Sequence, residues 1–302
     1  MHQPFDRLAG VLPINKPRGM TSKDVSRVLQ RSLGRVKLGH VGTLDPDAEG
    51  VLPVLFGTAT RVQDLLLDSP KTYWCQIFLG ETTDTLDREG TVTATAPWEH
   101  VTLEAAQQAA KTFLGPIEQI PPAFSAVKHK GKALYAYARQ EALSEEFLAT
   151  FLRKVEIYAL SLDSLEGNLL SLRMTCSKGT YVRSLVRDLC TALGTCGRVD
   201  RLVREAASGF SLDQTVSLDG LDEARMREVL VPIHRLREIP QLAIHSTEDV
   251  LSLLQGKELH SSLCLLPGTS IPSKPFLLVD SERAFGIGTC IGKDRIRLQR
   301  SL

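Results

Sequence analysis

The apolar residues of this chain follow two different spacings, which succeed one another in no regular order. Alternate residues are apolar over residues 72–79 and again over 170–176, which predicts half-buried strands. Over residues 21–33, 103–114 and 185–193 the spacing is that of a helix, and a glycine follows each of these stretches. Because strands and helices are mixed irregularly, the sequence predicts an α+β fold rather than a regular βαβ array.

The length and a change in composition predict two domains. A chain of 302 residues is long enough for two domains, or for one large domain with an appendage. After about residue 235 short apolar runs are separated by glycines and prolines, which is typical of a small β-rich domain. We therefore expect a larger domain over residues 1–235 and a small β-rich domain over residues 236–302.

The overall composition excludes several classes of protein. With 43% hydrophobic and 24% charged residues, the chain is expected to fold as a soluble globular protein. It contains no apolar stretch of the roughly 18 residues that a membrane span needs, and its N-terminus lacks the pattern of a secretory signal. The six cysteines form no CxxC pair, and the seven histidines complete no zinc-binding spacing. These features predict a reduced cytoplasmic protein with no structural metal and no membrane partner.

The net charge is only +1, but the charges are distributed unevenly along the chain. Basic residues dominate residues 16–37, 128–139 and 178–204, whereas acidic residues dominate residues 81–118. Nucleic acids are bound by local basic patches, so a net charge near zero does not exclude such a partner.

The segment GHVGTLDPDAEG, residues 39–50, brackets one aspartate, Asp45, with three glycines and a proline. Glycines permit positive φ angles and close backbone approach, and Pro46 favours an extended conformation at Asp45. The segment fits neither of the two common phosphate-binding glycine patterns. On spacing alone, a preset loop that presents a catalytic carboxylate and an ordinary turn both remain open.

Residues 39–54, GHVGTLDPDAEGVLPV, strongly resemble the motif around the catalytic aspartate of the tRNA pseudouridine synthases of the TruB type, which modify the T-loop uridine. The other motifs of that family occur in order along the chain: VLPINKPRGMTS (11–22), DSPKTYWC (68–75), QIPPAFSAVKHKGKALYAYAR (119–139) and CSKGTYVRSLVRDL (176–189). The resemblance implies a mixed, mainly antiparallel sheet of the pseudouridine synthase type with flanking helices. It also implies an RNA-contacting insertion at about residues 120–150 and a small PUA-like C-terminal domain.

The same resemblance implies the reaction and the partner. Enzymes of this family isomerise uridine to pseudouridine by detaching uracil from its ribose, rotating it and rejoining it through carbon. Such an isomerisation needs no redox or group-transfer cofactor, and the chain has no nucleotide or metal motif. The expected partner is the T-arm of tRNA, bound by a monomer that requires no protein partner.

The family aspartate that matches Asp45 is the essential catalytic residue, and the family arginine that matches Arg183 is its expected partner. A carboxylate in a dry site must stay ionised near neutral pH, and a paired guanidinium favours the ionised form. Taken without the resemblance, Arg183 also fits a phosphate or surface contact. Tyr73 matches the active-site tyrosine that stacks on the target base, although its spacing also fits a tyrosine packed in the core.

Three further site residues take their roles from the resemblance. Tyr181 and Leu202 match residues that line the uracil pocket, and His40 matches a histidine that contacts the RNA where the nucleotide is turned out. Without the resemblance, a lone histidine is more often structural. Lys16 and Pro17 match a further family motif, and we expect them to support the loop of Asp45 rather than to react.

Two other functions remain open. The related guide-RNA-dependent catalytic subunit usually has a longer and more basic chain than one of 302 residues with a net charge of +1. An RNA-folding or RNA-binding protein on a synthase scaffold belongs to a different class, and the intact set of Asp45, Tyr73 and Arg183 argues against lost catalysis. With Asp45 at the centre, we expect the three basic stretches around it, and the acidic stretch mostly elsewhere.

Overall fold

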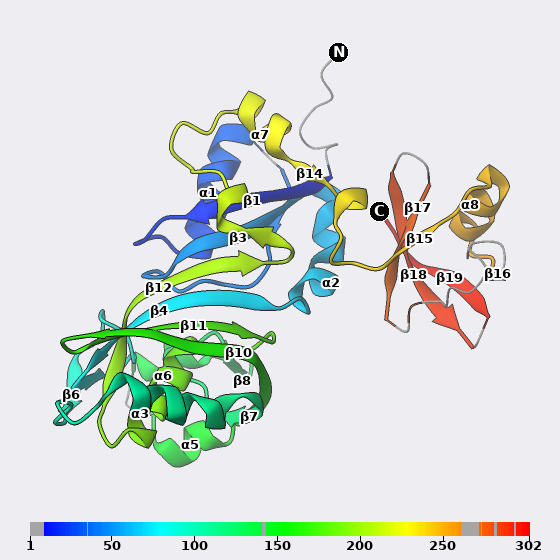
Figure 1. The fold of residues 1–302 in the computed structure, drawn as a ribbon. Helices are drawn as coiled ribbons and strands as arrows, with labels where there is room; N and C mark the ends of the chain where they lie inside the picture. Colours follow the sequence, from blue (N-terminus) through cyan, green and yellow to red (C-terminus); the bar gives the residue numbers. More distant parts are fainter. Residues whose placement is uncertain are drawn as a thin grey trace.

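The computed structural model describes residues 9–34, 36–140, 143–260, 272, 274–280, 283–292 and 294–302. Within these ranges the chain forms a ten-stranded sheet, a five-stranded sheet and two small two-stranded sheets. Figure 1 shows the ten-stranded sheet running through the larger body, with the five-stranded sheet beside it. The predicted α+β class is therefore confirmed.

The ten-stranded sheet is mainly antiparallel. Its continuous path runs β14 (Val231–Pro232), β1 (Gly10–Lys16), β3 (Glu49–Phe56), β12 (Gly197–Ala207), β4 (Lys71–Leu79), β11 (Leu169–Cys176), β10 (Arg153–Glu166) and β7 (Gly115–Gln119). Off this path, β2 (Leu38–His40) pairs with β3 and β13 (Phe210–Ser211) pairs with β12. Among the described strands of this sheet, β3 and β12 form the one parallel pair, and it lies at the centre.

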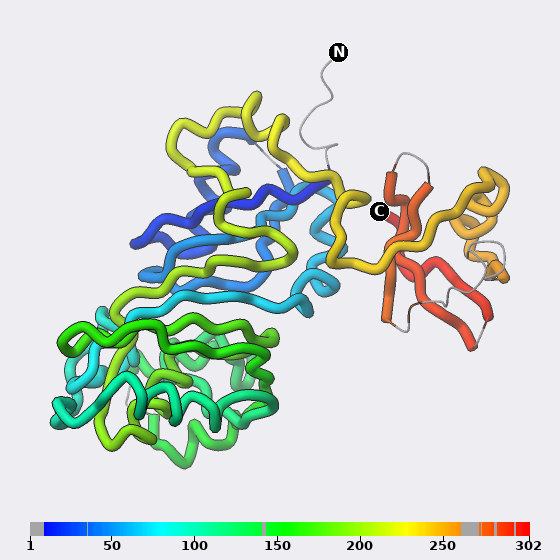
Figure 2. Tube along the Cα trace, in the orientation of Figure 1, coloured from blue at the N-terminus to red at the C-terminus, as the bar shows by residue number. Residues whose placement is uncertain are grey.

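The remaining strands form the smaller sheets. The five-stranded sheet has the order β15 (Gln241–Ala243), β17 (Phe276–Val279), β18 (Ala284–Ile291), β19 (Arg295–Ser301) and β16 (Leu259–His260). The two-stranded sheets are β5 (Glu81–Thr83) with β6 (Val92–Thr95), and β8 (Lys128–His129) with β9 (Lys132–Ala133). Figure 2 shows one connection, coloured yellow, that leads from the larger body to the five-stranded sheet.

Helices flank the sheets. The α-helices are α1 (Ser22–Leu33), α2 (Gln63–Leu67), α3 (Leu103–Ala110), α4 (Leu134–Ala138), α5 (Glu145–Ala149), α6 (Val182–Ala192), α7 (Glu223–Val229) and α8 (Thr247–Leu254). Short 3₁₀ helices are η2 (Gly57–Val62), η3 (Lys111–Phe113), η4 (Leu212–Gln214) and η5 (Ile233–Arg235). In Figure 1, α1 and α7 accompany the β1–β3 half of the sheet, and α3 and α6 accompany the β10–β11 half. Across the described residues, we find no helix whose length and apolar character would let it cross a membrane.

Local sequence signals account for several elements. Thr21 caps α1 in a capping box with Asp24, and the helix ends before Gly34, as its spacing predicts. In β4 every second side chain from Lys71 to Leu79 is buried, as alternation requires. The helix expected over 103–114 is shorter: α3 ends at Ala110, and the chain tightens into η3 before it reaches the glycine.

The ten-stranded sheet is covered on both faces where it includes β1 and β3. Leu12 and Leu52 point into the core beneath α1, and their neighbours Val11 and Val51 point into a second apolar cluster. That second cluster also contains side chains from α2 and from the C-terminal strands, among them Leu66, Leu277, Val279 and Ile287. Because alternate residues of one strand enter different cores, the central strands are nearly continuous apolar runs.

Candidate active site

Asp45 lies in the loop between β2 and β3, and its neighbours on both sides are held by the segment that joins β1 to α1. Lys16, the last residue of β1, is fully buried, and its Nζ donates to the Pro46 carbonyl oxygen at 3.1 Å. The Ser22 hydroxyl accepts from the Leu44 amide nitrogen at 2.9 Å. Because both neighbours are fixed, the Asp45 carboxylate is presented in a preset position.

Two glycines of this loop are required by geometry. Gly42 and Gly50 have φ angles of +70° and +102°, which other residues adopt only with strain. A Cβ atom on Gly50 would lie 2.3 Å from the carbonyl oxygen of Arg204 on β12. Glycine at this position therefore allows β3 and β12 to form the central parallel pair beside the Asp45 loop.

Arg183, in the first turn of α6, forms an ion pair with Asp45. Its Nη2 lies 2.8 Å from Asp45 Oδ2, and its side chain is only 4% exposed whereas that of Asp45 is 40% exposed. Nη1 donates to the Thr85 carbonyl oxygen at 2.8 Å, and Nη2 to that of Phe124 at 3.0 Å. These contacts fix the guanidinium. It therefore holds one carboxylate oxygen of Asp45 in place, while the Asp45 carboxylate stays open to solvent.

A second carboxylate, Asp87, reaches the same guanidinium. Asp87 Oδ2 lies 3.5 Å from Arg183 Nη1. The other oxygen, Oδ1, accepts from the Thr85 hydroxyl at 2.6 Å and from the Glu89 amide nitrogen at 3.1 Å. Burial raises the pKa of Asp87, while the Thr85 hydrogen bond and the Arg183 charge act in the opposite direction.

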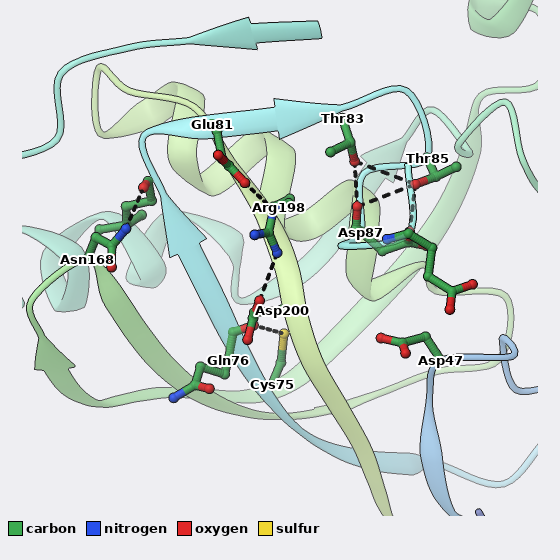
Figure 3. Close-up of polar contacts among 12 residues, drawn as sticks. Asp47, Cys75, Gln76, Glu81, Thr83, Thr85, Asp87, Asn168, Arg198 and Asp200 are labelled. Atoms are coloured by element: carbon green, nitrogen blue, oxygen red, sulfur yellow. Dashed lines mark hydrogen bonds and ion pairs between the residues drawn. The ribbon is translucent and has the colours of Figure 1, made fainter. Parts of the chain in front are cut away.

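The turn that carries Asp87 is tightly built. The Thr83 hydroxyl donates to the Asp87 carbonyl oxygen at 2.6 Å, and Leu86 adopts a left-handed φ of +62°. Figure 3 shows Thr83, Thr85 and Asp87 together at the end of β5. A non-glycine residue at positive φ is strained, and such strain persists where the surroundings fix the backbone. The turn therefore holds Asp87 in one orientation toward Arg183.

A neighbouring ion-pair cluster joins this turn to the central sheet. Arg198 on β12 contacts Glu81 Oε1 through Nε at 2.7 Å and Asp200 Oδ1 through Nη1 at 2.8 Å. Its guanidinium also lies 4.5 Å from the ring centre of Phe78. Figure 3 shows Arg198 between Glu81 and Asp200. Through this cluster, β5 and the turn that follows it are attached to β12.

The expectation that the acidic stretch lies away from the site is wrong for Asp87. Residues 81–118 contain this carboxylate, and Glu89 also lines a cavity at Asp45. The error arose because a sum of charges over 38 residues does not show that one turn within them, the turn of Asp87, lies at the site while the rest lies elsewhere. The signal that was present is the polar turn TTDTLDREG, residues 82–90, in which Thr83 and Thr85 precede Asp87.

Most of the predicted site residues meet at one small cavity of about 80 Å³. Its lining includes Asp45, Tyr73, Tyr181, Arg183 and Leu202. These side chains come from a loop, from β4, from the start of α6 and from β12, so that only the tertiary fold brings them together. Burial raises the pKa of Tyr73, so its hydroxyl is neutral at physiological pH.

His40 occupies a different place from the other five. It ends β2 and is not among the residues that line the small cavity. Its Nε2 lies 3.5 Å from the Thr43 hydroxyl, and Thr43 does line that cavity. Burial, together with the charge of Arg204, lowers the pKa of His40, so its imidazole is neutral near pH 7.

A larger cavity of about 590 Å³ also borders Asp45. Lys23 of α1, Arg139 after α4, and Arg183 of α6 all line it. Each of the three basic stretches therefore contributes a residue around Asp45, as their distribution predicted, although Arg35 lies outside the described residues.

The insertion at about residues 120–150 places its two tyrosines differently. Tyr135 is exposed and lines the larger cavity. Tyr137 packs edge-on against His129, with ring centres 6.0 Å apart, and its hydroxyl donates to the His129 carbonyl oxygen. Phe147 and Phe151 complete this small aromatic cluster. One tyrosine is thus available to a ligand, whereas the other holds the insertion together.

The described residues contain no group of three histidine, cysteine, aspartate or glutamate side chains arranged to hold a metal ion. The polar side chains that line the small cavity and the one adjoining it are those of Asp45, Tyr73, Arg183 and Arg204, the buried Lys71 and the exposed Lys178, besides several hydroxyl groups.

Comparison with known proteins identifies the family. The family model for the TruB family pseudouridylate synthase N-terminal domain matches residues 30–182. The "tRNA pseudouridine synthase B" of Azoarcus sp. (strain BH72) is 42% identical over 254 residues, which cover 83% of each chain. The chain belongs to the TruB family of pseudouridylate synthases. The expected family and enzyme class are thereby confirmed.

Further relatives extend the comparison over nearly the whole chain. The "tRNA pseudouridine synthase B" of Aromatoleum aromaticum is 39% identical over 296 residues, covering 96% of this chain and 92% of that one. The fold is shared with a solved Cbf5-Nop10-Gar1 complex, in which the matched chain has a TM-score of 0.73, 24% identity, and coverage of 97% of this chain and 84% of that one. At this sequence identity the structural match is evidence for the fold alone. Because it covers 97% of this chain, it includes the C-terminal sheet.

Proposed function

We propose that this TruB-family protein isomerises uridine to pseudouridine in the T-loop of tRNA, with Asp45 as the essential catalytic residue. The observation that carries the proposal is the Asp45–Arg183 ion pair, 2.8 Å long, which lines one cavity together with Tyr73, Tyr181 and Leu202. The names of the two relatives described above support tRNA as the substrate.

The reaction requires a carboxylate that stays ionised. The bond between C1′ and N1 breaks, uracil rotates, a bond forms between C1′ and C5, and the C5 proton is lost while N1 gains one. Whether Asp45 attacks the sugar, adds to the base or removes the proton, its negative charge is needed in each case. The nearly buried guanidinium of Arg183, 2.8 Å from Asp45 Oδ2, supplies the counterion for that charge when RNA covers the site.

The other residues have supporting roles in this proposal. Tyr73 stacks on the extruded uracil, and Tyr181 and Leu202 line its pocket. His40 contacts the RNA at the position that the uridine leaves, where a neutral imidazole offsets part of the cost of extrusion. No redox or group-transfer cofactor is needed, because the isomerisation oxidises or reduces nothing and transfers no group to a second molecule.

We propose different roles for the two domains. We assign catalysis to residues 1–235, with the insertion at about residues 120–150 closing over the T-loop. We assign further RNA contacts to a PUA-like domain over residues 236–302, whose described strands form the five-stranded sheet. The enzyme is proposed to act in the cytoplasm as a monomer, without a protein partner.

Tritium release tests the proposal. A hairpin with the sequence of a tRNA T-arm, labelled at C5 of uracil, is incubated with the wild-type protein, with Asp45→Asn, and with Asp64→Asn as a control on the exposed surface of α2. We expect release from the wild type and Asp64→Asn and none from Asp45→Asn. Release by Asp45→Asn would remove the catalytic role of Asp45. Release only after addition of a guide RNA would indicate the guide-dependent class, and binding without release an RNA-binding protein.

A further inference from the structure

A third cavity at Asp45 lies beside the proposed uracil pocket. Its volume is about 240 Å³, and it shares Thr43, Asp45, Tyr73, Thr180 and Tyr181 with the small cavity. If uracil occupies the small cavity, as proposed above, the ribose and phosphate of the same nucleotide must enter adjoining space, because they are covalently attached to the base. The third cavity adjoins the uracil pocket along five shared residues.

The walls of this cavity are positively charged. Lys71, Lys178 and Arg204 line it, and Asp45 is the one carboxylate in the lining. Lys178 is paired with Asp68, and Asp45 with Arg183. After these pairs are set aside, Lys71 and Arg204 remain, and neither has an ion-pair partner among the described residues. They are 5% and 1% exposed.

The hydrogen bonds of these two side chains supply no compensating charge. Lys71 Nζ donates to the carbonyl oxygens of Leu67 and Ser69, the latter at 2.6 Å. Arg204 donates through Nε to the Val51 carbonyl oxygen at 2.7 Å, and through Nη2 to that of Gly42 at 3.0 Å. Carbonyl groups carry no net charge, so two buried positive charges remain without a counterion among the described residues, which is unfavourable. Burial lowers the pKa of Lys71 to about 8, and the charge of Arg204 adds to that effect.

Three observations favour an anion at this place. An ammonium group has three donors, and two of those of Lys71 are used, so one remains for a ligand. Lys71 and Tyr73 are two residues apart on β4 and so lie on the same face of the strand, which orients both toward one nucleotide. The buried hydroxyl of Ser125, which also lines the cavity, has no hydrogen-bond partner in the described part of the chain.

We propose that this cavity binds a phosphate group adjoining the extruded uridine, with Lys71 as the contacting side chain and Arg204 as the charge behind it. The proposal rests on the proposed function, since the position of the uracil defines which phosphate is near. It gives Lys71 a part in binding the substrate backbone, separate from the chemistry at Asp45. A nucleotide would then be held at two points, by its base and by its phosphate.

A double-mutant cycle, with one change in the protein and one in the RNA, tests this proposal. T-arm hairpins are made with an uncharged methylphosphonate on the 5′ or the 3′ side of the target uridine, next to a 2′-deoxy nucleotide. Each is compared with a hairpin that has the same deoxy nucleotide and an ordinary phosphate. The Kd of every hairpin is measured for the wild type, for Lys71→Met, and for Lys111→Met. Lys111 is an exposed lysine at the start of η3 that donates to Gln108 of α3.

We expect one of the two methylphosphonates to weaken binding to the wild type about tenfold, the size of one charge-assisted hydrogen bond. Lys71→Met should bind the ordinary hairpin about tenfold more weakly and should lose nothing further from that methylphosphonate. Lys111→Met should behave as the wild type. If the loss caused by Lys71→Met and the loss caused by the methylphosphonate simply add, for the 5′ as well as the 3′ methylphosphonate, the proposal is overturned.

A second measurement uses only the wild type and does not depend on the folding of Lys71→Met. Because Lys71 loses its proton above about pH 8, the penalty caused by the critical methylphosphonate should shrink between pH 7 and pH 9. A penalty that is unchanged over this range would count against Lys71. Tritium release by the same preparation from the unmodified labelled hairpin tests the proposed function separately, since the cycle reports binding alone.

Discussion

Arg183 serves two carboxylates with one buried guanidinium. Asp45 is approached by Nη2 and Asp87 by Nη1, and the two carbonyl acceptors leave the group little freedom to rotate. Because the guanidinium is nearly buried, breaking its pair with Asp45 is costly. The arrangement explains how an open carboxylate keeps one fixed orientation.

Replacing Arg183 should affect turnover far more than binding. In Arg183→Met the Asp45 carboxylate loses its counterion and its orientation, so we expect the single-turnover rate to fall at least about a hundredfold, or roughly 3 kcal/mol in the barrier. The Kd for tRNA should change less than about threefold. Arg187→Met is the matched control on the next turn of α6, since Arg187 pairs with its neighbour Asp188. Equal losses in rate and affinity would make Arg183 an ordinary RNA contact.

Asp87→Asn tests whether the second carboxylate positions the guanidinium. The amide keeps the volume and the Thr85 contact but removes the charge that faces Arg183 Nη1. We expect about a tenfold or larger fall in rate with little change in Kd, from a rapid-mixing tritium assay. Asp84→Asn, on the same segment but bound to the Thr91 amide, is the control. A normal rate in Asp87→Asn would show that Arg183 is positioned without it.

Among the secondary-structure elements, β1 and α1 act together as the support of the Asp45 loop. The last residue of β1, Lys16, and the first residue of α1, Ser22, hold the two neighbours of Asp45. The loop is therefore fixed by strand and helix ends, which are more rigid than the loop itself. A buried lysine in this position should make the stability of the fold depend on pH.

The pH dependence has a definite sign. Burial lowers the pKa of Lys16 from its ordinary value of 10.5 to about 8. Between these values the unfolded chain holds the proton and the folded chain does not, so this group adds stability as pH rises through the window and loses it as pH falls through 8. The free energy of unfolding is measured in urea for the wild type and for Lys16→Met. From pH 8 to 10.5 we expect that of the wild type to rise, relative to that of Lys16→Met, by at most about 3 kcal/mol. A constant difference would contradict a depressed pKa.

Local patterns predicted those elements whose signals lie within one stretch of sequence. The cap at Thr21, the alternation in β4 and the glycine after α6 each act over a few residues, and the structure follows them. The end of α3 differs by four residues, because the last turn of the expected helix tightens into η3. The pairing of β3 with β12 could not be read in the same way, because it joins segments about 150 residues apart.

The candidate site shows the same limit. The motifs indicated Asp45, Tyr73 and Arg183, but nothing in the local sequence placed Asp87 against Arg183 or left Arg204 buried beside Lys71. Both contacts depend on which strands become neighbours. Charge counts by segment predicted the basic surroundings of Asp45 and missed the acids Asp87 and Glu89 among them.

In the whole molecule, the larger body and the C-terminal sheet share an apolar cluster. It contains Val51 and Leu66 from the first part of the chain, and Leu277 and Ile287 from the last. Arg61 Nη1 also donates to the Ser301 carbonyl oxygen at 2.6 Å. Burial of this kind couples the stability of the two parts, because neither can unfold without exposing apolar surface of the other.

Leu277→Ala tests this coupling. Leu277 is fully buried, so we expect a loss of about 2–5 kcal/mol in the free energy of unfolding, and one cooperative transition in both proteins. Val92→Ala, at an exposed position on β6, should change stability by less than about 0.5 kcal/mol. Two separate transitions, only one of them shifted by Leu277→Ala, would show that the parts unfold independently.

The most direct test of the proposed enzyme is the position of its product. A full-length unmodified tRNA transcript is treated with the wild type or with Asp45→Asn, and every pseudouridine is located by chemical labelling and primer extension. We predict one new pseudouridine, in the T-loop, formed by the wild type and absent with Asp45→Asn. Pseudouridine at other positions in place of the T-loop, or the same product from Asp45→Asn, would contradict the assignment.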